Sequence, residues 1–260
     1  KPSTALVSLI LRGGNKMDTI EVLGGMTLPG IDILLEAENI IVNDAVIEGK
    51  NINLTAEATY GGINPFSDLT TKVELSKAQL IASGNLQVNA NSIQQKPIVG
   101  NGILEVKKTI SKILVTDTVL SAGGNIAIIA KALLDIELNG FLFDSPMEIT
   151  AAVADILANT IINGTSQLTV GGDILLKAIS DFKSASLAKS EGQTGSVAFA
   201  VSVIESGAHA LLQGDAFADA AGNITIIAQN NTKADTLADG FIESDESGGA
   251  ATMAVSVVRS

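Results

Sequence analysis

Carboxylates are concentrated in one short stretch near the end of the sequence, and carboxylate oxygens are ligands that Ca²⁺ prefers. The candidate calcium ligands are Asp235, Asp239, Asp245 and Glu246. The stretch lacks the Gly-Gly-x-Gly-x-Asp repeat that marks calcium-binding β-rolls. We therefore expect no cofactor other than weakly held calcium, and a solvated surface loop is the alternative.

Cleavage of a glycosidic bond needs two carboxylates roughly 5–10 Å apart, and sugar binding uses exposed aromatic faces. The aromatic supply is small: Tyr60 and Phe66 form the one local pair. A lyase also needs a basic residue as proton acceptor, yet Arg12 and Arg259 are the only arginines. The sequence therefore favours a protein without catalytic residues.

His209 is the single histidine, with Ser206 and Asp215 nearby in the sequence. Closeness in sequence does not make a catalytic triad, which depends on geometry in space. A zinc site needs several His or Cys ligands, and the chain has no cysteine. We expect His209 to be an ordinary strand residue.

The formal net charge of −12 excludes the basic face that nucleic-acid binding requires. It also disfavours an anionic membrane surface. Apolar residues make up 46 % of the chain and aromatic residues only 3 %, so a core would consist of Ala, Val, Ile and Leu. Such small and branched side chains suit stacked β-strands.

One phrase recurs along the chain, best seen in Gly-Asn-Ile-Ala-Ile-Ile-Ala at 124–130. Its Asn or Asp position is occupied by Asp32, Asn51, Asn85, Asn125, Asp173 and Asn223. The intervals are 19, 34, 40, 48 and 50 residues, which predicts a repeat with loops of variable length. We expect these six residues to stack as a structural corner ladder.

The phrase alternates apolar residues with a period of two, which indicates a strand. A second short strand precedes it, and Gly can adopt a positive φ at low cost while Asn and Asp tolerate one. Each unit is therefore predicted to be strand, tight corner, strand.

The clearest repeat lies in 172–260, where 172–188 matches 222–238 at an offset of 50. Five short strands fit such a unit, which predicts two solenoid turns of roughly 25 residues each. Ser145-Pro146-Met147-Glu148 resembles a helix start, and the apolar spacing that follows predicts a short helix near 146–158. Another strand pair is the alternative there.

Several positions facing away from the predicted core are apolar, whereas a solvated strand should carry polar residues there. They are Leu34, Ile129, Leu175 and Ile227. We expect long inter-strand segments to cover them in part; contact with a flanking loop, the predicted helix or another chain is the alternative.

With these residues in view, the chain resembles the repeat regions of giant bacterial exported proteins, the filamentous-haemagglutinin-like adhesins. The likeness lies in 123–130, in 221–232 and in the Gly-Ser-Val-Ala-Phe-Ala-Val-Ser-Val block at 195–203. The resemblance implies a right-handed parallel β-helix, export, and a role as a surface stalk. It transfers no catalytic residues.

We therefore expect an all-β, right-handed parallel β-helix forming one array over 1–260, as a piece of a longer chain. The expected role is a stiff structural and adhesive spacer, outside the cell or on the bacterial surface. Its partners would be neighbouring repeats and cell-surface or host glycans or proteins, with no nucleic acid and no transmembrane segment. A carbohydrate-active or carbohydrate-binding β-helix is the alternative.

Overall fold

The computed structural model of the chain describes residues 8–14, 17–61, 66–94, 104–141, 147–192, 195–242 and 249–260. Every regular element in these ranges is a β-strand, and every pair of hydrogen-bonded neighbours is parallel. The prediction of an all-β chain built from parallel strands is confirmed.

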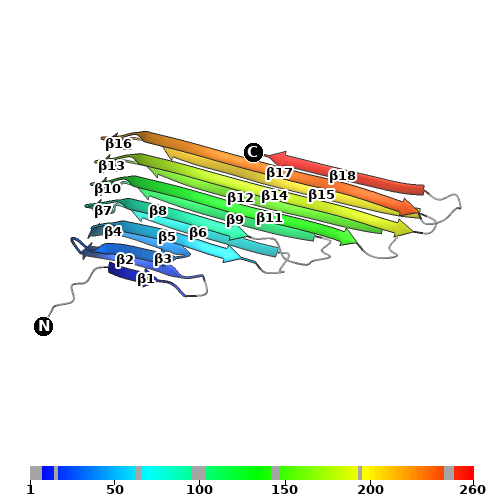
Figure 1. Ribbon diagram of the computed structural model, residues 1–260, viewed down its shortest axis with the longest axis horizontal. Coiled ribbons are helices and arrows are strands. Elements are labelled where there is room, and N and C mark those ends of the chain that lie inside the picture. The colour runs from blue at the N-terminus through cyan, green and yellow to red at the C-terminus, as the bar shows by residue number, and fades with distance from the viewer. Residues whose placement is uncertain are drawn as a thin grey trace.

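Two sheets face each other across the core (Figure 1). The first sheet is ordered β1 (Ser8–Arg12), β3 (Asp32–Ala37), β5 (Ile52–Tyr60), β8 (Leu86–Gln94), β11 (Ile126–Phe141), β14 (Ile174–Gly192), β17 (Ile224–Ile242). The second is ordered β16 (Phe217–Ala220), β13 (Gln167–Val170), β10 (Val119–Ala122), β7 (Gln79–Ala82), β4 (Asn39–Gly49), β6 (Phe66–Ser76), β9 (Leu104–Thr116), β12 (Met147–Asn163), β15 (Gly195–Leu212), β18 (Gly249–Arg259), with β2 (Thr19–Thr27) beside β4.

A full repeat contains one long strand in each sheet and one four-residue strand. The chain runs out along the first sheet, comes back along the second as a return strand, and then forms the short strand before the Gly-Asx corner. Ile174 of β14 pairs directly with Ile224 of β17. The 50-residue unit is therefore one layer, and the prediction of two turns per unit is wrong. The reason is strand length, since β14 has 19 residues where five short strands were expected in the unit.

The repeats widen along the chain. In the first sheet the strands grow from 9 residues in β8 to 16 in β11 and 19 in β14. Figure 1 shows this taper from the blue to the orange strands. The sequence predicted loops of variable length, but much of the unequal spacing of the corners lies in the length of the strands.

The predicted helix near 146–158 is also wrong, because β12 occupies this stretch. Ile149, Val153 and Leu157 fit a helix by their spacing of four. A spacing of four also keeps residues on one face of a strand, so the pattern does not separate the two structures. Parallel pairing with β9 on one side and β15 on the other decides for the strand.

The core changes character along each long strand. Near the corner it is built from Ile, Leu and Val, including Leu86, Ile126 and Ile174. Farther out the inward residues of β14 and β15 are mostly Ser and Ala, with Phe182 and Ile204 as the large exceptions. Hydroxyls bond across this part of the core, as in Thr150–Ser186 at 2.9 Å and Ser206–Thr232 at 2.7 Å.

Candidate functional site

The six Asx residues of the repeated phrase form one hydrogen-bonded column at the corner. Asn51 Nδ2 donates to Asp32 Oδ1 at 2.8 Å. From there on, each backbone N–H donates to the side-chain oxygen one layer earlier, at 2.7–2.9 Å. These bonds run Asn85 to Asn51, Asn125 to Asn85, Asp173 to Asn125 and Asn223 to Asp173.

The glycine before each Asx is required by close packing. A Cβ added to Gly124 would lie 2.3 Å from Asn85 Oδ1, and one added to Gly172 would lie 2.2 Å from Asn125 Oδ1. Neither glycine has a positive φ. The prediction that these glycines are needed for positive φ at the Gly-Asx corner is therefore wrong.

Apart from Gly30 in the turn before β3, the left-handed conformation near these corners occurs before the short strand, at a second bend. Asp44, Lys77 and Asp117 have φ near +50° there, followed in later layers by Gly164 and Gly214. Asp117 Oδ1 accepts the Thr165 N–H at 2.9 Å. This hydrogen bond is the main reason that the pKa of Asp117 is lowered.

The corner column brings no pair of carboxylates together. Asp32 stacks on Asn51, and Asp173 lies between Asn125 and Asn223. The oxygens that bond along the column are already acceptors for the next layer. Its chemistry is structural.

The calcium candidates are only partly described. Asp235 and Asp239 lie on β17, while Asp245 and Glu246 fall outside the described residues. Lys233 Nζ is 2.8 Å from Asp235 Oδ2, and this hydrogen bond raises the pKa of Lys233. Among the described residues, no three His, Asp or Glu side chains gather as a metal site.

Ser206 and His209 lie on opposite sides of β15. Ser206 is buried between the sheets against Thr232, whereas His209 is exposed. His209 lines a hollow of about 530 Å³ together with Asp155 and Glu205. A serine–histidine pair is not formed, because alternate residues of a strand point to opposite faces.

The aromatic pair is also divided. Tyr60 ends β5 in the first sheet, with its ring centre 5.9 Å from Lys107 Nζ. Phe66 begins β6 in the second sheet and is 57 % exposed. The two rings therefore do not make a common platform for a sugar.

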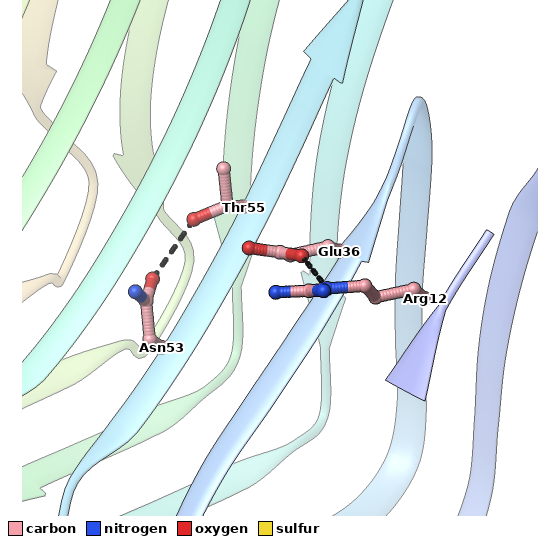
Figure 2. Close-up of polar contacts among 4 residues, drawn as sticks. All are labelled: Arg12, Glu36, Asn53 and Thr55. Atoms are coloured by element: carbon pink, nitrogen blue, oxygen red, sulfur yellow. Dashed lines mark hydrogen bonds and ion pairs between the residues drawn. The ribbon is translucent and has the colours of Figure 1, made fainter. Parts of the chain in front are cut away.

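Figure 2 shows the polar outer side of the first sheet near its start. Arg12 of β1 pairs with Glu36 of β3, and Thr55 donates to Asn53 at 2.9 Å on β5. A shallow hollow of about 240 Å³ lies beside Arg12 and Glu36. Exposed pairs of this kind contribute little to stability.

Charged residues buried near the start of β9 are a feature that sequence reasoning missed. Glu105 and Lys107 both point inward and are almost fully buried. Burial raises the pKa of Glu105, and the Lys107 charge partly opposes this. Among the described residues, Glu105 Oε2 has no hydrogen-bond partner.

We expect Glu105→Gln to stabilise the protein at neutral pH and to have no effect near pH 4. The raised pKa means that the folded state holds this proton more tightly than the unfolded chain does. Stability is therefore lost as the pH rises above the ordinary value of 4.5. Urea unfolding of both proteins at pH 4 and pH 7 measures the difference. Glu57→Gln, at an exposed site on β5, is the control, and an equal gain at both pH values would contradict the assignment.

The outer face of the second sheet is the largest feature that the sequence did not reveal. In the outer parts of the return strands, the larger apolar residues point outward and the smaller or polar residues point inward. We call the outward set the apolar face, and its four cross-strand rows follow from the pairing register. They are Phe66–Val106–Val153–Val203–Val257, Leu104–Ala151–Val201–Val255, Ile149–Phe199–Met253 and Met147–Val197–Ala251.

A charged row borders this face on the side toward the corner. It crosses the five return strands in the order Asp68, Lys108, Asp155, Glu205, Arg259. Lys108 Nζ lies 3.8 Å from Asp155 Oδ2, and both side chains are 46 % exposed. The row is a surface feature open to a partner.

The outward positions named from sequence lie on the first sheet. Leu34, Ile129 and Leu175 are half-buried there, and Ile227 on the edge strand β17 is 37 % exposed. Farther along, the first sheet carries charged rows such as Asp135–Lys183–Lys233. The two outer faces therefore differ strongly in polarity.

The described strands define an all-β repeat protein built from parallel sheets. No family model matches this chain, and no curated protein or solved structure matches it either. Within the described ranges there is no helix of the length and hydropathy needed to cross a membrane.

Proposed function

We propose that the chain is a structural and adhesive segment of a large bacterial surface or secreted protein, wound as a right-handed parallel β-helix. It acts as a stiff spacer that presents loops. Its partners are its own neighbouring repeats and glycans or proteins on a cell surface. It carries out no reaction.

One observation supports this proposal above the others: the pairing between layers continues in register from β3 to β17, with the corner column beside it. Every strand of the first sheet between β1 and β17 is hydrogen-bonded to the layers before and after it, and aliphatic residues repeat above one another inside. Such stacking resists bending because any bend must break several parallel hydrogen bonds together.

Force spectroscopy tests the spacer role. Because the chain lacks cysteine, single cysteines at Ser8 and Ser260 give unique attachment points. We expect the chain to hold its length under load and then unfold in discrete steps that correspond to layers. Continuous lengthening at low force, without steps, would rule out a stiff spacer.

A carbohydrate-active role is the second candidate, favoured by one observation. Asp155 and Glu205 are paired in register and line the same hollow as His209. Release of reducing ends or unsaturated products from a panel of acidic polysaccharides would support it, provided that Asp155→Asn and Glu205→Gln abolish the release. No release by the unaltered chain would remove this candidate.

A further inference from the structure

The apolar face has the composition of a core rather than of a solvated surface. On β15 the outward residues Val197, Phe199 and Val201 are larger than the inward residues Ser196, Ala198 and Ala200 that they alternate with. β12 repeats this, with Ile149 and Val153 outward and Thr150 inward. Sheets that bury both faces carry apolar residues on both. The second sheet therefore has the pattern of a sheet with a partner on its outer side.

The face is large enough to form an interface. Its rows contain 15 outward residues on five return strands. At about 4.8 Å between strands and about 6.6 Å between successive outward residues, this is about 500 Å² in projection. The largest apolar patch on a soluble monomer is typically about 300–600 Å², and such a patch is often a functional surface. A stable protein interface buries about 800 Å² of accessible surface on each partner. The accessible surface of protruding side chains exceeds the projected area, and the charged row adds to it, so this face reaches that range.

The order of charges along the bordering row identifies the partner. The row reads negative, positive, negative, negative, positive from β6 to β18. Consider a second copy laid face to face, related by a two-fold axis that runs parallel to the strands over β12. Asp68 then meets the partner's Arg259, and Lys108 meets the partner's Glu205. The two Asp155 residues meet at the axis, each with its own Lys108 beside it.

We propose that the chain forms a two-fold dimer in which the apolar faces of two copies pack against each other. In this arrangement β12 lies over β12, β9 over β15 and β6 over β18, as in the aligned packing of two sheets. The row of Phe66 and the four valines lies over the same row of the second copy in reverse order. A self-complementary patch is what a two-fold interface requires.

The first test introduces a charge at the centre of the face. Val153→Asp is expected to convert the dimer to a monomer, measured by sedimentation equilibrium of the full chain. Ile179→Asp places the same charge on the outer face of the first sheet, on β14 between β11 and β17, and should leave the dimer intact. Far-ultraviolet circular dichroism confirms that both variants are folded.

The second test uses the charged row and does not depend on the apolar residues. Lys108→Glu alone gives two Glu–Glu contacts in a dimer, and Glu205→Lys alone gives two Lys–Lys contacts. A mixture of the two variants restores two Glu–Lys contacts. We expect each variant alone to dimerise at least about tenfold more weakly than the unaltered chain, and the mixture to form a heterodimer. Each variant has the same contacts within its own chain whether it is alone or in the mixture. A difference in dimer affinity between the two samples therefore comes from contacts across the interface.

Three results would overturn the proposal. The first is an unaltered chain that stays monomeric up to about 100 μM, a concentration at which affinities of the micromolar class are already visible. The second is equal association of the two charge variants alone and mixed. The third is a monomer that floats with neutral phosphatidylcholine vesicles and loses this on Val153→Asp, which would assign the face to a lipid surface instead. All three are independent of the spacer role, since force spectroscopy is carried out on single chains.

Discussion

Gly172→Ala is expected to destabilise the protein by about 2–4 kcal/mol, although it adds a single methyl group. The new Cβ would lie 2.2 Å from Asn125 Oδ1 and 3.0 Å from the Gly124 carbonyl oxygen. Both atoms belong to the layer before it, which is held by the layers on either side. The Asn125 side chain must then move, and the hydrogen bond from the Asp173 N–H to its Oδ1 is lost. Overpacking of a fixed site and loss of one hydrogen bond together give this magnitude.

Urea unfolding of the variant measures the loss, and two comparisons identify its cause. Gly61→Ala adds a methyl group where no atom of the described part of the chain lies within 4 Å, and it should change stability by less than about 0.5 kcal/mol. Asn125→Ala removes the clashing oxygen at a cost of about 1 kcal/mol. In that background Gly172→Ala should cost much less than it does alone. Simple addition of the two costs would show that the clash is not with Asn125.

Ala188→Leu is expected to cost about 1–3 kcal/mol, because it adds three carbons to a part of the core where only small side chains pack together. Ala188 is fully buried on β14 and packs with Ala198 and Ala200 of β15. The long strands on both sides fix the space between the sheets, so the core cannot open at one residue without disturbing its neighbours.

Ala185→Leu is the matched control, three residues away on the same strand. Ala185 points outward and is half-buried, so the leucine side chain can extend into solvent. Its stability should change by less than about 0.5 kcal/mol. A similar loss for both variants, by thermal and urea unfolding, would mean that strand preference and not interior volume sets the cost.

The sequence by itself determined the strands and the order of the layers. Strict alternation around Ile126 and Ile174 marks strands, because a period of two fits no other regular structure. The recurring Asx residues were expected to stack, and the hydrogen bonds from Asn51 to Asn223 run between consecutive members. Local pattern suffices here because each layer repeats the same contacts as the one before.

Only the tertiary structure decided how long the strands are and what the corner glycine is for. Nothing in the local sequence of β14 shows that the strand continues for 19 residues. Several shorter strands were therefore predicted in its place. The demand on Gly172 comes from Asn125, which lies 47 residues earlier in the chain. A requirement set by an atom in another layer cannot be seen in the residue's own neighbourhood.

The tertiary structure also decided which side chains in the outer parts of the return strands point into the core. Alternation in β9 would place Leu104 and Val106 inside and Glu105 and Lys107 outside, yet the structure has the reverse. The phase of a strand is fixed along its whole length, so the buried Ile113 nearer the corner sets the orientation of the rest. The sequence therefore shows that the two faces of the strand differ, and the pairing of whole layers decides which face is buried.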